Sequence, residues 1–147
     1  MTWHIKTFQE LTASELYAIL RIRAEIFVVE QTCVYQDVDN KDPKAYHLWT
    51  EEDGEVTAYL RILQKGVSYP EIAIGRVLVK ETHRRRGLAE EMMQTAISFV
   101  EKELGEDVIR ISAQRYLQKF YEKLGFVQTS EVYLEDGIEH IEMVRRK

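Results

Sequence analysis

The stretch Val77-Leu-Val-Lys-Glu-Thr-His-Arg-Arg-Arg-Gly-Leu-Ala89 passes from an apolar run through a basic segment into a pattern of helical spacing. The run that leads into it, residues 73–79, is nearly all apolar, which is typical of a central strand buried on both faces. After Gly87 the apolar residues recur at every fourth position, which predicts an amphipathic helix. These residues are Leu88, Met92, Ala96 and Val100. The stretch therefore predicts a buried strand, a basic turn and a helix.

A turn between a strand and a helix is a favourable place for an anion. The first turn of a helix presents unpaired backbone N–H groups and the positive end of its dipole, and both attract phosphate. Gly87 lets the backbone approach an anion closely, and Arg84, Arg85 and Arg86 add positive charge. The simpler alternative is a solvated basic loop. The pattern is neither a Walker loop nor the Gly-x-Gly-x-x-Gly dinucleotide motif.

The chain before this stretch predicts a strand at residues 3–8, a helix and a long loop. Thr12, with Glu15 three residues later, forms a capping box that starts the helix. Apolar residues at helical spacing extend that helix to about Phe27. Residues 28–44 show no clean period and contain many turn formers, which predicts a long loop of the kind that often carries function.

The remaining pattern predicts a mixed sheet. Strands at 45–50, 56–64 and 71–80 form an antiparallel meander, with Asp53-Gly54 as a hairpin turn. A strand expected to run parallel to the last of these follows the helix that ends near Gly105. A second helix and a final hairpin complete the chain. The expected ranges are 108–113 for the strand, 116–124 for the helix, and 127–134 with 138–145 for the hairpin. The fold class is therefore α/β, with a mixed central sheet and helices on its faces.

Composition, charge and the cysteine count exclude several classes of function. The chain has 147 residues and a net charge of −5, which indicates one domain, residues 1–147, and gives no sign of nucleic-acid binding. Cys33 is the only cysteine, so a disulfide within the chain and a cysteine zinc site are excluded. The N-terminus lacks the apolar core of a signal peptide, and no apolar run is long enough to span a bilayer. We expect no membrane association and a cytoplasmic location.

Two motifs resemble the GNAT superfamily of N-acetyltransferases. Arg84, Gly87 and Ala89 match its acetyl-CoA-binding pattern Arg/Gln-x-x-Gly-x-Gly/Ala, and 120–126 is similar to its Tyr-x-x-x-Gly-Phe signature. Four further segments resemble the ElaA-like branch of the superfamily. They are 23–39, His47, 75–77 and 136–140.

This resemblance implies a GNAT acyl-CoA N-acyltransferase fold with helices on both faces of the sheet. It also implies transfer of an acetyl group from acetyl-CoA, used as a co-substrate without a metal, to a primary amine of a small molecule or peptide. Two alternatives remain open, an acyl-homoserine lactone synthase and a non-catalytic module that binds and senses acyl-CoA. Homodimers are common for this fold, so a second copy of the chain is a further candidate partner.

The resemblance also assigns the residues of the donor site. The backbone of Val77, Leu78 and Val79 would hold the thioester carbonyl. The pyrophosphate would lie on the stretch made by Arg84, Arg85, Arg86, Gly87, Leu88 and Ala89. Gln114 occupies a position where the superfamily often has asparagine in contact with the pantetheine arm, and a glutamine amide can make the same kind of contact.

The catalytic and acceptor residues are expected on several different elements. Tyr121 falls on the general-acid tyrosine of the superfamily, although a tyrosine on an amphipathic helix also suits a core position. The base candidates are Glu30, His140 and His47, each of which can equally be a structural side chain. Arg23 and Arg76 are the candidate acceptor-binding residues. The alternatives are a local helix contact for Arg23 and an ion pair for Arg76. The acidic run at 37–42 lacks metal-ligand spacing and is interpreted as turn formers or as a negative rim that attracts a cationic amine.

Overall fold

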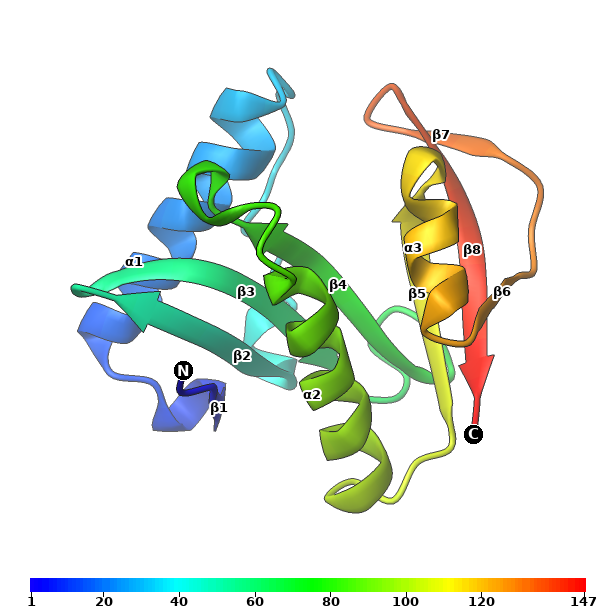
Figure 1. Ribbon diagram of the computed structural model, residues 1–147, viewed down its shortest axis with the longest axis horizontal. Coiled ribbons are helices and arrows are strands. Elements are labelled where there is room, and N and C mark those ends of the chain that lie inside the picture. The colour runs from blue at the N-terminus through cyan, green and yellow to red at the C-terminus, as the bar shows by residue number, and fades with distance from the viewer.

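An eight-stranded mixed sheet runs through the computed structural model, which describes residues 1–147 (Figure 1). The strands lie in the order β1-β2-β3-β4-β5-β8-β6, and β7 also pairs with β8. All pairs are antiparallel except β4 and β5, which are parallel as the sequence predicts. The strands are β1 His4–Thr7, β2 Ala45–Glu52, β3 Glu55–Leu63, β4 Ile72–Val79, β5 Val108–Gln114, β6 Phe126–Gln128, β7 Tyr133–Glu135 and β8 Ile138–Arg146.

Helices cover both faces of this sheet. One core cluster joins α1 to the sheet through Ile19, Ile22 and Trp49, and a larger cluster joins α2 and α3 to the opposite face. The helices are α1 Ala13–Arg23, the π-helix η2 Ala24–Glu30, α2 Leu88–Lys102 and α3 Gln118–Lys123. The short 3-10 segments are η1 Phe8–Glu10, η3 Asp42–Lys44, η4 Glu81–His83 and η5 Arg115–Leu117. No helix has the length and apolar character required to cross a membrane.

The first helix begins where the sequence predicts and ends differently. Thr12 and Glu15 form the predicted capping box, with backbone-to-side-chain hydrogen bonds in both directions. Regular α-helix stops at Arg23, four residues before the predicted end at Phe27, and the chain continues as the π-helix to Glu30. Its wider winding shows in the bond from the Gln31 N–H to the Ile26 carbonyl, five residues back. The predicted loop at 28–44 is therefore helical in its first residues.

Strands β4 and β5 diverge, a feature that the sequence pattern does not reveal. They pair only at Ile72 with Ile109 and at Ala73 with Arg110, after which β4 continues to Val79 without a partner on that side. Opposite this stretch the register of β3 with β4 shifts, between the pairs Tyr59–Leu78 and Arg61–Gly75. Such a bulge increases the local twist of a strand. The gap that results is where a ligand can reach the middle of the sheet.

The C-terminal hairpin is more broken than predicted. In place of one strand at 127–134, the short strands β6 and β7 pair with successive parts of β8. The turn of the hairpin is the predicted Asp136-Gly137, with φ of 51° and 77°, the left-handed conformations that a tight two-residue hairpin requires. This turn sets Tyr133 opposite His140 and Glu135 opposite Ile138.

Six charged side chains form a closed ring that ties the 31–44 segment to the sheet and to α1. Each arginine in the ring contacts two aspartates and each aspartate contacts two arginines, at 2.6 to 3.3 Å. In order around the ring they are Arg23, Asp37, Arg76, Asp39, Arg61 and Asp42. Arg23, Arg61, Asp37 and Asp42 are buried. The ring carries three charges of each sign, so it has no net charge.

The ring also changes the acidity of its members. Burial alone would raise the pKa of Asp42, but hydrogen bonds and charge from Arg23 and Arg61 outweigh burial and lower that pKa. The same balance, with Arg61 and Arg76, lowers the pKa of Asp39. A carboxyl whose pKa is lower in the folded than in the unfolded chain stabilises the fold above its unfolded pKa, about 4 for aspartate, and loses that effect as pH falls.

We predict that Asp42→Asn lowers the free energy of unfolding by about 3–5 kcal/mol at pH 7, because two buried arginines lose a shared anion. Urea unfolding followed by circular dichroism measures this. Glu71→Gln, which breaks the solvent-accessible pair with Arg110, is the matched control and should leave the free energy of unfolding nearly unchanged. The difference between wild type and Asp42→Asn should shrink as pH falls below about 4. Equal losses in the two variants at pH 7 would contradict a structural role for the ring.

Candidate active site

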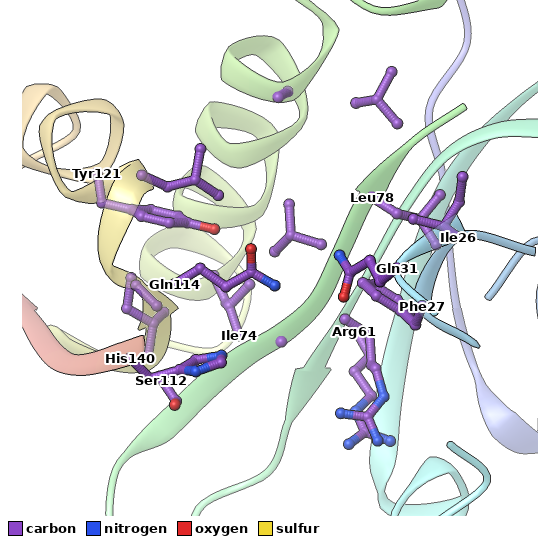
Figure 2. A pocket seen from close by; sticks show the side chains of 18 of the residues that line it. Ile26, Phe27, Gln31, Arg61, Ile74, Leu78, Ser112, Gln114, Tyr121 and His140 are labelled. Atoms are coloured by element: carbon purple, nitrogen blue, oxygen red, sulfur yellow. The ribbon is translucent and has the colours of Figure 1, made fainter. Parts of the chain in front are cut away.

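A cavity of about 760 Å³ occupies the gap between the diverging strands β4 and β5. Its walls come from six parts of the chain: η2 and the segment after it, β3 with the loop that follows it, β4, the turn and start of α2, the β5–α3 region and the β7–β8 hairpin. Figure 2 shows Tyr121, Gln114 and His140 on one side of β4, and Gln31, Phe27 and Arg61 on the other. The cavity therefore brings together residues more than a hundred positions apart in the sequence.

One end of the cavity is formed by the N-terminus of α2. Gly87, with φ of 76°, precedes the first helical residue, and no side chain caps the free N–H groups of that turn. Nothing lies within 4 Å of the place that a Cβ on Gly87 would occupy, so the space in front of the turn is open. An open, uncapped helix start attracts phosphate. Of the predicted loop residues, Arg84, Arg85, Gly87, Leu88 and Ala89 line the cavity and Arg86 does not.

Two of the predicted residues in this region bind each other. The guanidinium of Arg84 donates to the Glu30 carboxylate at 2.7 Å and to the Val79 carbonyl at 3.0 Å. Arg84 thus connects the end of η2 to the last residue of β4. Arg85, whose φ is 65°, has no carboxylate partner and also lines the cavity. Arg85 therefore places unpaired positive charge on the cavity wall beside the helix start, and Glu30 is held as the partner of an arginine.

The middle of the cavity is lined by β4 and by two polar side chains opposite it. Val77, Leu78 and Val79 lie on the wall, and their strand has no neighbour on the β5 side. Gln114, the last residue of β5, also lines the cavity. Tyr121 is 6% exposed, and its hydroxyl, which has no hydrogen-bond partner in the protein, points into the cavity (Figure 2). Burial raises the pKa of the Tyr121 phenol above its usual value, so the group stays protonated.

His140 lies on β8 with its ring on the cavity wall. Its Nδ1 is 2.7 Å from the Ile138 carbonyl, and because a carbonyl only accepts, Nδ1 carries a proton. The Nε2 of a neutral ring is then free to accept another, and it lies 3.4 Å from the Glu135 carboxylate. The ring also stacks on Tyr133, whose hydroxyl bonds to Ser112. His140 is thus fixed in both orientation and tautomer.

Two predicted residues lie elsewhere. Arg23, a candidate for the acceptor site, is fully buried in the charged ring and reaches neither the cavity nor a local helix partner. This corrects its assignment, because its charge is taken up by Asp37 and Asp42. His47, an alternative base, is also fully buried, bonded to the Tyr59 hydroxyl and the Asp42 carbonyl. Burial lowers the pKa of His47, which keeps the ring neutral.

Arg76 combines the two arrangements that the sequence suggested for it. It forms ion pairs in the ring, and it also lines the cavity. The acidic residues at 37–42 do not form a negative rim, because arginines neutralise all three aspartates. No group of three or more His, Cys, Asp or Glu side chains is arranged to hold a metal ion.

The sequence interpretation missed several cavity residues. Glu135 could have been found from the sequence, because a two-residue turn at Asp136-Gly137 dictates which residues of the hairpin oppose each other. The same turn places Tyr133, which stacks on the ring of His140, opposite that histidine. Arg61 and Tyr35 carried no such signal. Their places depend on contacts with Asp39 and Asp37 in a segment that has no regular structure.

Comparison with known proteins gives consistent results. Residues 13–147 match the family described as the acetyltransferase (GNAT) domain. Protein ElaA of Escherichia coli K12 is 37% identical over 145 residues, which cover 97% of this chain and 95% of ElaA. The crystal structure of E. coli ElaA matches with a TM-score of 0.93 at 36% identity, and the match covers 99% of this chain and 100% of that one.

Two further structures extend the comparison. An acyl-CoA N-acyltransferase from Pseudomonas aeruginosa matches with a TM-score of 0.92 at 41% identity, covering 99% of each chain. BjaI, a CoA-dependent acyl-homoserine lactone synthase, matches with a TM-score of 0.80 over 97% of this chain and 81% of its own. At 19% identity BjaI shares the fold alone.

The predicted mixed sheet with its GNAT fold, and the resemblance to the ElaA-like branch, are therefore confirmed. The chain belongs to the GNAT family, whose members are acyltransferases that use acyl-CoA.

Proposed function

We propose that this protein transfers an acetyl group from acetyl-CoA to the primary amine of a small molecule or peptide. The observation that carries the proposal is the shared cavity. The uncapped start of α2 and the Tyr121 hydroxyl open into the same space along the free edge of β4. A phosphate-binding turn and a proton donor are two of the groups that transfer from a CoA thioester needs.

The donor half is suited to a CoA molecule. The pyrophosphate would lie against the N–H groups that follow Gly87, with Arg85 adding charge. The Gln114 amide would contact the pantetheine arm, and the backbone of Val77–Val79 would hold the carbonyl. Acetyl-CoA supplies a thioester carbon that an amine can attack.

An amine that arrives as an ammonium ion first loses one proton to solvent, because only the neutral amine has a lone pair. The neutral amine must then lose a second proton as one reaches the sulfur. As the C–N bond forms and the C–S bond breaks, Nε2 of His140 takes the proton of the amine. Tyr121 gives its proton to the departing sulfur, and exchange with solvent restores both side chains. Burial keeps the Tyr121 phenol protonated, as a donor must be.

His140 is the better base on the geometry of its partners. Its Nδ1 proton is fixed by the Ile138 carbonyl, so Nε2 is available, and Glu135 can stabilise the imidazolium that forms. Glu30 is held 2.7 Å from the Arg84 guanidinium, so its carboxylate is already engaged in an ion pair.

We predict that Tyr121→Phe lowers kcat by roughly 10²- to 10⁴-fold while the Kd for acetyl-CoA changes little, because only a proton donor is lost. Release of free CoA thiol in the presence of an amine panel measures kcat. The matched control is Tyr116→Phe, since Tyr116 also lines the cavity but is 76% exposed. Undiminished turnover in Tyr121→Phe would refute the acid role. Tight acetyl-CoA binding without turnover in the wild type would favour a sensor.

We expect the two base candidates to separate in the same assay. His140→Gln, which retains a hydrogen-bond donor, should lose roughly 10²- to 10⁴-fold in kcat. Glu30→Gln should lose less than about tenfold, because its partner Arg84 remains held by the Val79 carbonyl. The reverse order would assign the base to Glu30.

Gly87→Ala should weaken CoA binding by roughly tenfold or more, because a residue with a Cβ is strained at a φ of 76° and tilts the phosphate-binding turn. Gly105, with φ of 65° beyond the other end of α2, provides a control with the same backbone strain. Titration calorimetry should show normal CoA affinity in Gly105→Ala, and thermal unfolding should show similar destabilisation in both variants. Equal CoA affinities would place the pyrophosphate elsewhere.

A further inference from the structure

Arg76 adopts a backbone conformation that is unusual for its place in the fold. Its φ is 53°, and it is the only non-glycine residue inside a strand that has a left-handed conformation. The other such residues lie in turns or loops. A residue held this way is strained, and strain of this kind is concentrated at functional sites. The bulge in β4 directs the Arg76 side chain onto the cavity wall.

The guanidinium of Arg76 is held in place, but one of its nitrogen atoms has no hydrogen-bond partner in the protein. Its Nε and Nη2 donate to Asp37, and Nη2 also reaches Asp39. The group lies over the Tyr35 ring at 5.4 Å. Nη1 has no partner in the protein, and the side chain is 22% exposed. An arginine that is held on one edge and open on the other is prepared to donate to an anion in the cavity.

Lys41 places a second cationic side chain on the same wall. Its ammonium contacts the Ser68 hydroxyl at 2.8 Å and has no carboxylate partner. Asp39, the acidic side chain of this wall, is already shared by Arg61 and Arg76. The wall therefore offers positive donors and no unpaired anion.

The hairpin wall opposite has the reverse character. Glu135 and Asp136 line the cavity, and neither has an arginine or lysine partner. Glu135 contacts only His140 and Ser112. Arg110, the nearest guanidinium on β5, is paired with Glu71 and Glu142. An amine that approaches His140 would therefore meet negative charge, which attracts an amine in its cationic form.

The two walls also meet. The Cys33 thiol, in the segment after η2, is 3.7 Å from the Asp136 carbonyl in the hairpin turn. This contact joins the two walls between which the acceptor would bind. A cavity whose walls are joined in this way suits a small molecule better than a residue within a peptide.

We propose that the acceptor is a small zwitterion, an amine that also carries a carboxylate, such as a free amino acid. The carboxylate would bind Nη1 of Arg76 with help from Lys41, and the amine would lie at His140 and Glu135. This inference rests on the proposed N-acetyltransferase function and specifies the substrate class of the same site.

Matched pairs of acceptors test the proposal. Release of CoA thiol should be compared for free amino acids, including ω-amino acids, and for the amide of each one, which keeps the amine and removes the carboxylate. The wild type should prefer the acid by roughly 10- to 100-fold in kcat/KM, the range expected for one charge-assisted contact. Amides that react as well as the acids, or better, would overturn the substrate class while leaving the acetyltransferase function intact.

Variants then assign the contact. Arg76→Met should lower kcat/KM for the acid by roughly 10- to 100-fold more than for the amide, mainly through KM, which removes the preference. Because Arg76 belongs to the charged ring, Lys41→Met provides a second variant outside the ring, with a smaller loss of preference expected. Lys119→Met, on an exposed position of α3, is the control. Equal losses for acid and amide in both cavity variants would contradict the carboxylate contact. Failure of the proposed function would differ, since no acceptor would then release thiol.

Discussion

The closed ring of three arginines and three aspartates is the interaction on which the acceptor half of the cavity depends. It joins the last residue of α1, the irregular segment at 37–42, and the strands β3 and β4. The irregular segment has few other reasons to adopt one conformation. Buried charges are tolerated only when they are paired and hydrogen-bonded, and the ring satisfies its members through alternation of sign. One side-chain atom, Nε of Arg61, is buried without a partner.

The second constraint is the divergence of β4 from β5, which converts a continuous sheet into one with an accessible middle. If the two strands paired along their full length, Val77–Val79 would face another strand. Because pairing stops at Ala73 and Arg110, that edge faces the cavity instead. The helix start at Gly87 lines the same cavity as Tyr121, whose hydroxyl Figure 2 shows pointing into that space. The ring and the divergence meet at Arg76, where the bulge in β4 lies.

Local patterns allowed most of the fold to be predicted, because their causes are local. The capping box at Thr12, the apolar run before the basic turn and the hairpin turn at Asp136 each depend on a few adjacent residues. The position of Arg23 depends on residues 14 and 19 positions further along the chain, and periodicity does not encode such partners. The π-helical winding after Arg23 and the parting of β4 from β5 are likewise tertiary effects. The donor site depends on a local strand, turn and helix pattern, whereas the acceptor site depends on tertiary contacts. The sequence therefore predicts the donor site more completely.

Neutrality of the ring changes what the acceptor half can recognise. An acidic rim would attract any cationic amine through its long-range field, and that attraction weakens with salt. A neutral ring has little such field, so recognition must come from single donors with fixed direction, such as Nη1 of Arg76. Direction is costly to maintain in a flexible side chain, since an ordered arginine loses rotamer freedom. Here the aspartates that cancel the charge of Arg76 also hold its guanidinium in place, so charge compensation and orientation come from the same contacts.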